Sequence, residues 1–279
     1  MQVSLTAALD TEQLDSLMTV LDDAEMVLGA FTEEELALLE PPQDERLVPL
    51  PLVDAVPDGE ARDQVLAGAF RSLVARGLVE LGVEPGELYA TGSLSTLLSV
   101  RSAPNSLLIV EHVEEEDPSR VVVYGLPVET DRGIETLLME ESVAVLGHHE
   151  FVLRSVESQA AALTEWLGVV PPEAPAGNGH PHSVTRERLD AALDDLRAVT
   201  RLHALKRDDD GTGEGDYKEV ELTLVDGGEH GRFMVLFQTA DDDTEGMLAV
   251  PVEALDLQAF FAGLLRLDLT PFNEALAAS

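Results

Sequence analysis

The fold class is indicated most clearly by residues 106–128, which read SLLIVEHVEEEDPSRVVVYGLPV. Two apolar, β-branched runs, 106–113 and 120–128, flank the acidic turn 114–119. Runs of this length and composition predict β-strands, and the short turn between them predicts antiparallel pairing. Similar runs predict further strands, at 143–146, 150–156, 217–225, 232–239 and 246–252.

Helical patterns surround these strands. Thr32 and Glu35 form a capping-box pattern at the start of a short helix, 32–39. A longer apolar stripe ends at Gly77, a residue suited to the left-handed conformation that terminates helices. Apolar residues spaced by three and four predict the other helices, which are one that begins after Asp10 or Thr11 and those in 60–81, 158–166, 184–205 and 255–267.

The order helix, strand meander, helix occurs twice along the chain. The first half is expected in 1–170 and the second in 184–279, with the proline- and glycine-rich segment 171–183 as a linker or exposed loop. Helices that are segregated from antiparallel strands define an α+β protein. We therefore predict an α+β fold of antiparallel meanders with flanking helices and, as a hypothesis, two pseudo-symmetric halves.

Composition excludes several functional classes. The 279 residues include 54 Asp and Glu against 17 Lys and Arg, a formal net charge of −37. A nucleic-acid or membrane partner is therefore not expected, because binding to phosphate groups depends on Lys and Arg. The sequence has no cysteine for a disulfide or a thiolate site, no signal-peptide pattern, and 45% apolar residues for a core. We expect a cytoplasmic protein, whose acidity reflects either high salt or a high-GC codon bias.

Four of the histidines occur in two pairs, which are candidate metal ligands. His148 and His149 fall in a probable turn, and His180 and His182 fall in the expected linker. Zinc sites need three or four ligands on rigid elements, and the sequence has no His-Glu-x-x-His spacing. We therefore predict solvated loop histidines and no metal site.

Acidic and glycine-rich loops also fail to predict a catalytic or cofactor site. The acidic loop 208–216 has its first glycine too early for a calcium-binding EF-hand. The glycine-rich segment 226–231 is rimmed by acid, which favours a hairpin turn over a phosphate-binding loop. A winged-helix interpretation of 61–81 has too few positive charges for DNA recognition. No nucleophile-elbow or P-loop motif occurs, so we predict no enzymatic activity and no cofactor.

An apolar surface for a protein partner is the remaining candidate. Aromatic residues make up only 4% of the chain, and several lie close together near the C-terminus. The alternative is that these side chains form core. The predicted partner-binding residues are Phe233, Phe237, Phe260, Phe261, Leu264 and Leu265.

Several short phrases occur in a characteristic order after an opening helix that begins beyond Leu5 and Thr6. They are PLPL at 49–52, LVARGLV at 73–79, EPGEL at 84–88, LTLVD at 222–226, GRF at 231–233 and LAVP at 248–251, with a final amphipathic helix. In this order the chain resembles the EspG-like proteins, cytosolic chaperones associated with type VII (ESX) secretion.

The resemblance implies a non-catalytic function. It implies two pseudo-symmetric halves around an antiparallel sheet, and binding to the exposed tip of a PE–PPE-type or other helical client before export. Such a chaperone masks an apolar patch of its client with a complementary surface that has a polar rim. The alternative function is that of an acidic immunity or structural-assembly protein, which binds a basic partner through its negative field.

Overall fold

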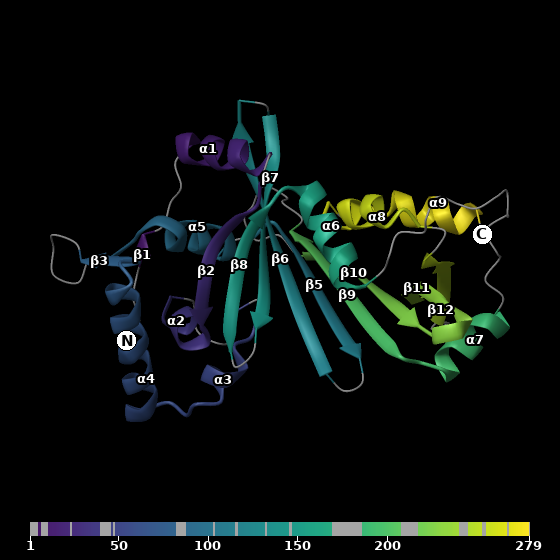
Figure 1. Ribbon diagram of the computed structural model, residues 1–279, viewed down its shortest axis with the longest axis horizontal. Helices are drawn as coiled ribbons and strands as arrows, with labels where there is room; N and C mark the ends of the chain where they lie inside the picture. The colour runs from purple at the N-terminus through teal and green to yellow at the C-terminus, as the bar shows by residue number, and fades with distance from the viewer. Residues whose placement is uncertain are drawn as a thin grey trace. The chain divides into compact units, whose positions relative to one another are not determined.

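The computed structural model describes fifteen stretches of the chain, shown in Figure 1. They are residues 5–6, 11–22, 24–39, 46, 48–81, 88–102, 104–114, 117–131, 133–144, 147–168, 186–207, 217–239, 245–252, 255–266 and 268–278. The predictions for the linker 171–183, for His180 and His182, and for the acidic loop 208–216 concern residues outside these stretches.

The described strands form a nine-stranded antiparallel sheet and a small three-stranded sheet. The large sheet has the order β12-β11-β10-β9-β5-β6-β7-β8-β2. Its strands are β2 (Met26–Thr32), β5 (Ser106–Glu114), β6 (Asp117–Thr130), β7 (Gly133–Ala144), β8 (His148–Arg154), β9 (Ala198–Arg207), β10 (Tyr217–Asp226), β11 (Arg232–Thr239) and β12 (Glu245–Pro251). The small sheet, in the order β1-β4-β3, contains β1 (Leu5–Thr6), β3 (Val79–Leu81) and β4 (Leu88–Ala90).

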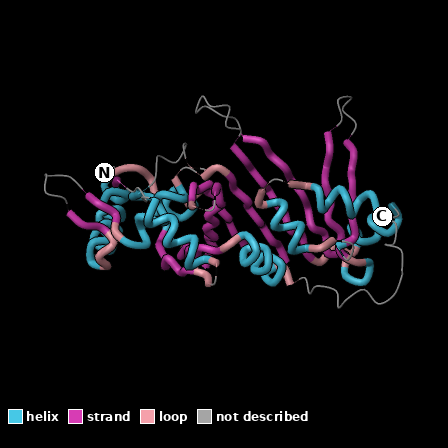
Figure 2. Tube along the Cα trace, turned by 90° about the horizontal axis from the view of Figure 1, so that it is seen from above, coloured by secondary structure: helices cyan, strands magenta, loops and turns pink. Residues whose placement is uncertain are grey.

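Figure 2 distinguishes the described helices, in cyan, from the strands of the sheets, in magenta. The helices are α1 (Thr11–Leu21), α2 (Glu33–Leu39), α3 (Pro51–Asp54), α4 (Glu60–Ala75), α5 (Gly92–Arg101), α6 (Val156–Trp166), α7 (Arg186–Asp194), α8 (Leu257–Leu264) and α9 (Thr270–Ala278). Antiparallel strands with separate helices confirm the predicted α+β class. In the described part of the chain, every helix is too short or too polar to cross a membrane.

Contacts divide the chain into two compact units. Unit 1 is Met1–Pro104 with Leu126–Arg154, and unit 2 is Asn105–Gly125 with Ser155–Ser279. These units differ from the predicted halves 1–170 and 184–279. Strand β5 pairs with β9 along its whole length, and it therefore belongs to unit 2 with the later strands. The pseudo-symmetry of the two halves stays a prediction.

Unit 1 contains the end of β6 from Leu126 onward, strands β7, β8 and β2, the small sheet and helices α1–α5. The capping box at the start of α2 is confirmed, because the Glu35 N–H donates to Thr32 Oγ1 at 3.3 Å and the Thr32 N–H donates to Glu35 Oε2 at 3.2 Å. The helix end at Gly77 is also confirmed. Gly77 has φ +68°, and the Leu78 N–H donates to the Leu73 carbonyl at 2.9 Å, which is the Schellman arrangement.

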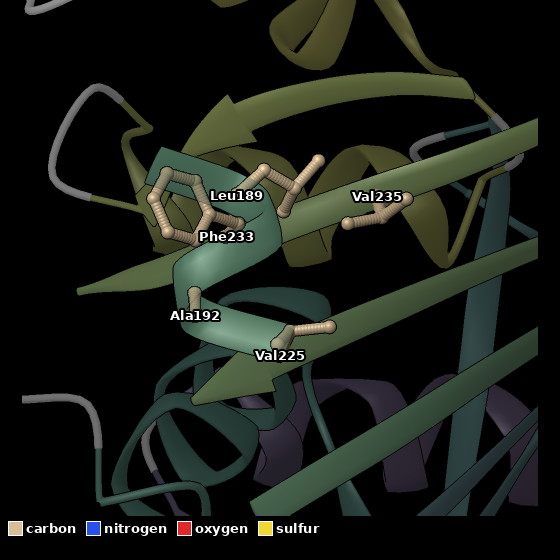
Figure 3. Packing of buried hydrophobic residues seen from close by; sticks show 5 residues of the cluster. All are labelled: Leu189, Ala192, Val225, Phe233 and Val235. Carbon is tan, nitrogen blue, oxygen red and sulfur yellow. The ribbon is translucent and has the colours of Figure 1, made fainter. Parts of the chain in front are cut away.

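Unit 2 contains β5, β6 as far as Gly125, and β9–β12, with α6–α9. Helix α6 packs on α8, and α7 packs on β10 and the hairpin that follows it. Figure 3 shows five buried side chains of the α7 contact, namely Leu189, Ala192, Val225, Phe233 and Val235.

Several predictions of secondary structure need correction. The predicted helix 184–205 ends at Asp194, and its second part is strand β9. Its apolar residues fit both periods, but pairing with β5 and β10 selects the strand, in which Leu202 and Ala204 face inward. Strand β2 was not predicted, and β7 is much longer than the predicted 143–146.

Candidate functional site

Five of the six predicted partner-binding residues lie in the core of unit 2. Their exposed fractions are 0% for Phe233, 1% for Phe260, 0% for Phe261, 1% for Leu264 and 5% for Leu265. The Phe260 and Phe261 rings pack edge to face, with centroids 5.3 Å apart. These five side chains present almost no surface to a partner, and a binding surface has to be sought elsewhere. The side chain of Phe237 lies outside the described part.

A row of three valines leads from this core to solvent. Val225 on β10 pairs with Val199 on β9, which pairs in turn with Val113 on β5, so the three side chains share one sheet face. Helix α7 covers the first of them, because Leu189 and Ala192 pack on Val225. At the other end of the row, Val113 is 45% exposed. Apolar surface therefore continues out from under α7.

The exposed end of this row is a hollow of about 350 Å³, which we call the apolar hollow. Its walls come from β5, from β9 and from the connection between α7 and β9. It is lined by Glu111, Val113, Leu196, Arg197, Ala198, Val199 and Arg201. Leu196 is 47% exposed, so two large aliphatic side chains are accessible at this one place.

The hairpin between β10 and β11 positions the connection that lines the hollow. The Arg197 N–H donates to the Asp226 carbonyl at 2.9 Å, which fixes the start of β9. Gly227 lies so close to α7 that an added Cβ would be 2.4 Å from the Ala192 Cα. Gly228 has φ +57° and is overlain by the Arg197 guanidinium. The predicted hairpin is confirmed: close packing against α7 requires glycine at 227, and the left-handed φ favours glycine at 228.

Charged groups surround the apolar floor. Arg201 lies directly opposite Glu111 across the β5–β9 pair, and both side chains are exposed. The Arg197 guanidinium is exposed and lies 3.9 Å from the Asp195 carboxylate. Opposite charges paired on adjacent strands contribute only modestly to stability but give the surface a polar rim. An apolar centre with a charged rim is the arrangement of protein-binding surfaces.

Unit 1 contains a buried ionic cluster, which we define as Glu33, Arg101, Glu141 and His149. Their exposed fractions are 2%, 8%, 0% and 0%. Arg101 donates from Nε to Glu141 Oε2 at 3.0 Å and from Nη2 to Glu141 Oε1 at 3.3 Å. His149 Nδ1 lies 2.5 Å from Glu141 Oε1, and His149 Nε2 lies 3.7 Å from Glu33 Oε1. The prediction that His149 is a solvated loop residue is therefore wrong.

The cluster ties five elements together by electrostatics. Burial by itself raises the pKa of the Glu141 carboxyl, but the Arg101 charge and hydrogen bonds from His149 and Arg101 outweigh it and lower the pKa to about 2. Glu33 Oε2 accepts the N–H groups of Leu52 and Val53, at 2.6 and 3.0 Å, where α3 begins. Helices α2, α3 and α5 are thereby joined to β7 and β8.

The burial of the ionic cluster indicates a role in stabilising the fold. Its four side chains are at most 8% exposed and are held by hydrogen bonds and ion pairs to one another. Among the described residues, no group of three or more His, Asp and Glu side chains is arranged to hold a metal ion.

No protein-family model matches the sequence, and a comparison with curated proteins gives no significant match.

Proposed function

We propose that the protein is a non-catalytic binding protein, an EspG-like secretion chaperone that masks an apolar surface of a helical client before export. The apolar hollow of unit 2 is the proposed contact surface. The observation that supports this proposal is the valine row that emerges from under α7 and ends in exposed Val113, beside exposed Leu196.

The size of the hollow suits a temporary contact. At about 350 Å³ it can receive one or two apolar side chains from the tip of a helical hairpin. An interface with so small an apolar centre binds reversibly, because affinity depends on a few well-buried anchors. A chaperone that must release its client at the export machinery needs such a contact.

The negative charge of the protein would favour its association with a basic client. The net charge of −37 attracts clients that have basic rims and keeps the complex in solution. Salt screens this attraction at separations beyond the Debye length, which is about 8 Å at physiological ionic strength, whereas it leaves apolar contacts intact. Salt therefore separates the two components of binding.

The alternative function is that of an acidic immunity or structural-assembly protein that binds a basic partner by charge. The net charge favours it, because charge-led association needs no apolar anchor. Under this alternative the partner would dissociate in high salt, and substitutions in the apolar hollow would have little effect.

Co-expression tests the proposal. The chain is co-expressed with the helical-hairpin proteins encoded beside it, purified by an affinity tag and washed in low and in high salt. Leu196→Asp places a charge at the apolar hollow and should abolish the complex. Leu193→Asp is the matched control, because Leu193 is 44% exposed on α7 and does not line the hollow.

Three outcomes are informative. Loss of the complex with Leu196→Asp and retention with Leu193→Asp, in both salt conditions, supports the chaperone. A complex that forms equally with both variants but dissociates in high salt supports the acidic alternative. Failure of every neighbouring helical protein to co-purify contradicts the proposed function.

A further inference from the structure

The opposite face of the same strands in unit 2 carries a second cavity, of about 220 Å³. Strand alternation places His112 and Thr200 on this face, whereas Glu111 and Arg201 point to the apolar hollow. We call this cavity the Trp166 pocket. Its polar and aromatic lining groups are His112, Glu114, Trp166, Thr200, Asp226 and Arg232.

The His112 imidazole lies close to three of the groups that line the pocket. His112 Nδ1 lies 2.8 Å from Thr200 Oγ1, which holds the ring in place. The Trp166 ring packs against it at a centroid distance of 5.8 Å and an angle of 68°. The Glu114 carboxylate lies 3.9 Å from its Nε2. An indole and a carboxylate therefore flank the same ring in one cavity.

The Arg232 guanidinium lines the pocket as well, and the Asp226 carboxylate neutralises its charge. Arg232 donates from Nε to Asp226 Oδ2 at 2.7 Å and from Nη1 to the Gly168 carbonyl at 3.2 Å. Asp226 uses its other oxygen to accept the Gly228 N–H at 2.9 Å. Within the described part of the chain, Glu114 has no Lys or Arg partner. Of the two carboxylates that line the pocket, Asp226 is therefore paired with an arginine and Glu114, among the residues that the structure describes, is not.

We propose that the Trp166 pocket binds the guanidinium of an arginine side chain presented by a protein partner. A cation gains both from the indole π-system and from the Glu114 carboxylate. The cavity is smaller than a typical small-molecule site, which fits a single side chain. Glu114 is also the first of four consecutive acidic residues in the sequence, so the local charge favours a cation.

Unit 1 already contains the same chemistry inside the chain. The Arg76 guanidinium donates to Glu35 Oε2 at 2.8 Å and lies 4.9 Å from the centroid of the Phe31 ring. A carboxylate and an aromatic ring are thus sufficient to hold a guanidinium in this protein. The Trp166 pocket also contains an aromatic ring and a carboxylate, each of which lies against the His112 imidazole.

This inference goes beyond the proposed chaperone function and does not depend on it. The Trp166 pocket and the apolar hollow lie on opposite sheet faces, and their defining side chains differ. A partner that uses the Trp166 pocket must expose an arginine side chain, whether or not the same partner also contacts the apolar hollow.

The fluorescence of Trp166 provides the test, because it is the only tryptophan in the chain. The full chain is titrated with acetyl-Gly-Arg-Gly-amide, with the same peptide containing citrulline, and with free arginine. Citrulline keeps the shape of arginine and removes its charge. We expect saturable fluorescence changes with the arginine peptide, and at least a two-fold weaker response with the other two ligands.

Two variants test whether the arginine peptide binds in the Trp166 pocket. Glu114→Gln should weaken binding of the arginine peptide about two- to five-fold, the range expected of a partly exposed ion pair. Glu187→Gln, at an exposed acidic residue on α7 outside the pocket, should leave binding unchanged. Equal binding of the citrulline peptide, or equal weakening by both variants, would overturn the proposal. Equal binding of free arginine would overturn the assignment to a protein partner.

Discussion

Replacing Glu141 with glutamine tests the buried ionic cluster most directly. Glutamine preserves the shape of the side chain but removes the charge that faces Arg101 and His149. Arg101, whose side chain is 6% exposed, then loses its ion pair with the Glu141 carboxylate. Loss of one partner of a buried ion pair is strongly destabilising, because the other charge stays desolvated.

The size of the effect follows from the pKa of Glu141. That pKa falls from 4.5 to about 2 on folding, and each unit corresponds to about 1.4 kcal/mol. The ionised carboxylate therefore contributes about 3 kcal/mol of stability. Since the folded pKa is lowered, this contribution is complete above pH 4.5 and is lost as the pH falls toward about 2.

Urea unfolding, followed by circular dichroism at a series of pH values, measures the effect. At neutral pH, Glu141→Gln should lower the free energy of unfolding by about 3 kcal/mol. The difference from the original chain should shrink as the pH falls below 4.5, because protonation then removes the same charge from Glu141. Comparing the two proteins cancels the titration of the other acidic residues.

A matched control is Glu150→Gln, an exposed position on β8. It should change the free energy of unfolding by less than about 0.5 kcal/mol at every pH. If Glu141→Gln destabilises by less than about 1 kcal/mol at neutral pH, or by an amount independent of pH, the electrostatic interpretation of the cluster is refuted.

Backbone and capping predictions can be checked by the same unfolding experiment. Gly227→Ala should destabilise by about 1–3 kcal/mol, because the new Cβ would lie 2.4 Å from the Ala192 Cα. Gly68→Ala, in the interior of α4 with its nearest contact at 3.8 Å, should instead stabilise by about 0.5–1 kcal/mol. Thr32→Ala removes the side-chain acceptor for the Glu35 N–H and should cost about 1 kcal/mol; no measurable cost would contradict its capping role.

The parts of the fold that could be predicted are those determined by nearby residues. The capping box of Thr32 and Glu35 and the left-handed Gly77 depend on interactions within a few residues, so their patterns are sufficient. Strand β9 could not be predicted, since residues 198–205 fit a helical period equally well. Its neighbours β5 and β10 lie far away in sequence and decide the outcome by pairing.

The candidate sites depend on register, which the sequence alone did not provide. Val113 and Val199 meet only because β5 pairs with β9 in one particular register. For His149 a signal was available, because it alternates with Phe151 and Leu153, and all three side chains are fully buried on β8. The prediction placed His149 in a turn and so missed this alternation.

The chain has only 17 basic residues, and several of them form ion pairs with buried carboxylates. Unit 1 uses arginines to neutralise carboxylates that are almost completely removed from solvent, in the pairs Arg46–Asp54, Arg76–Glu35 and Arg101–Glu141. Arginine suits this role because its guanidinium donates several fixed hydrogen bonds and stays charged when buried. Each arginine that pairs with a buried carboxylate is less available to balance an exposed one. Because these buried pairs are neutral overall, the formal net charge of −37 is carried by the other ionised groups of the chain, and their field favours the approach of positively charged groups.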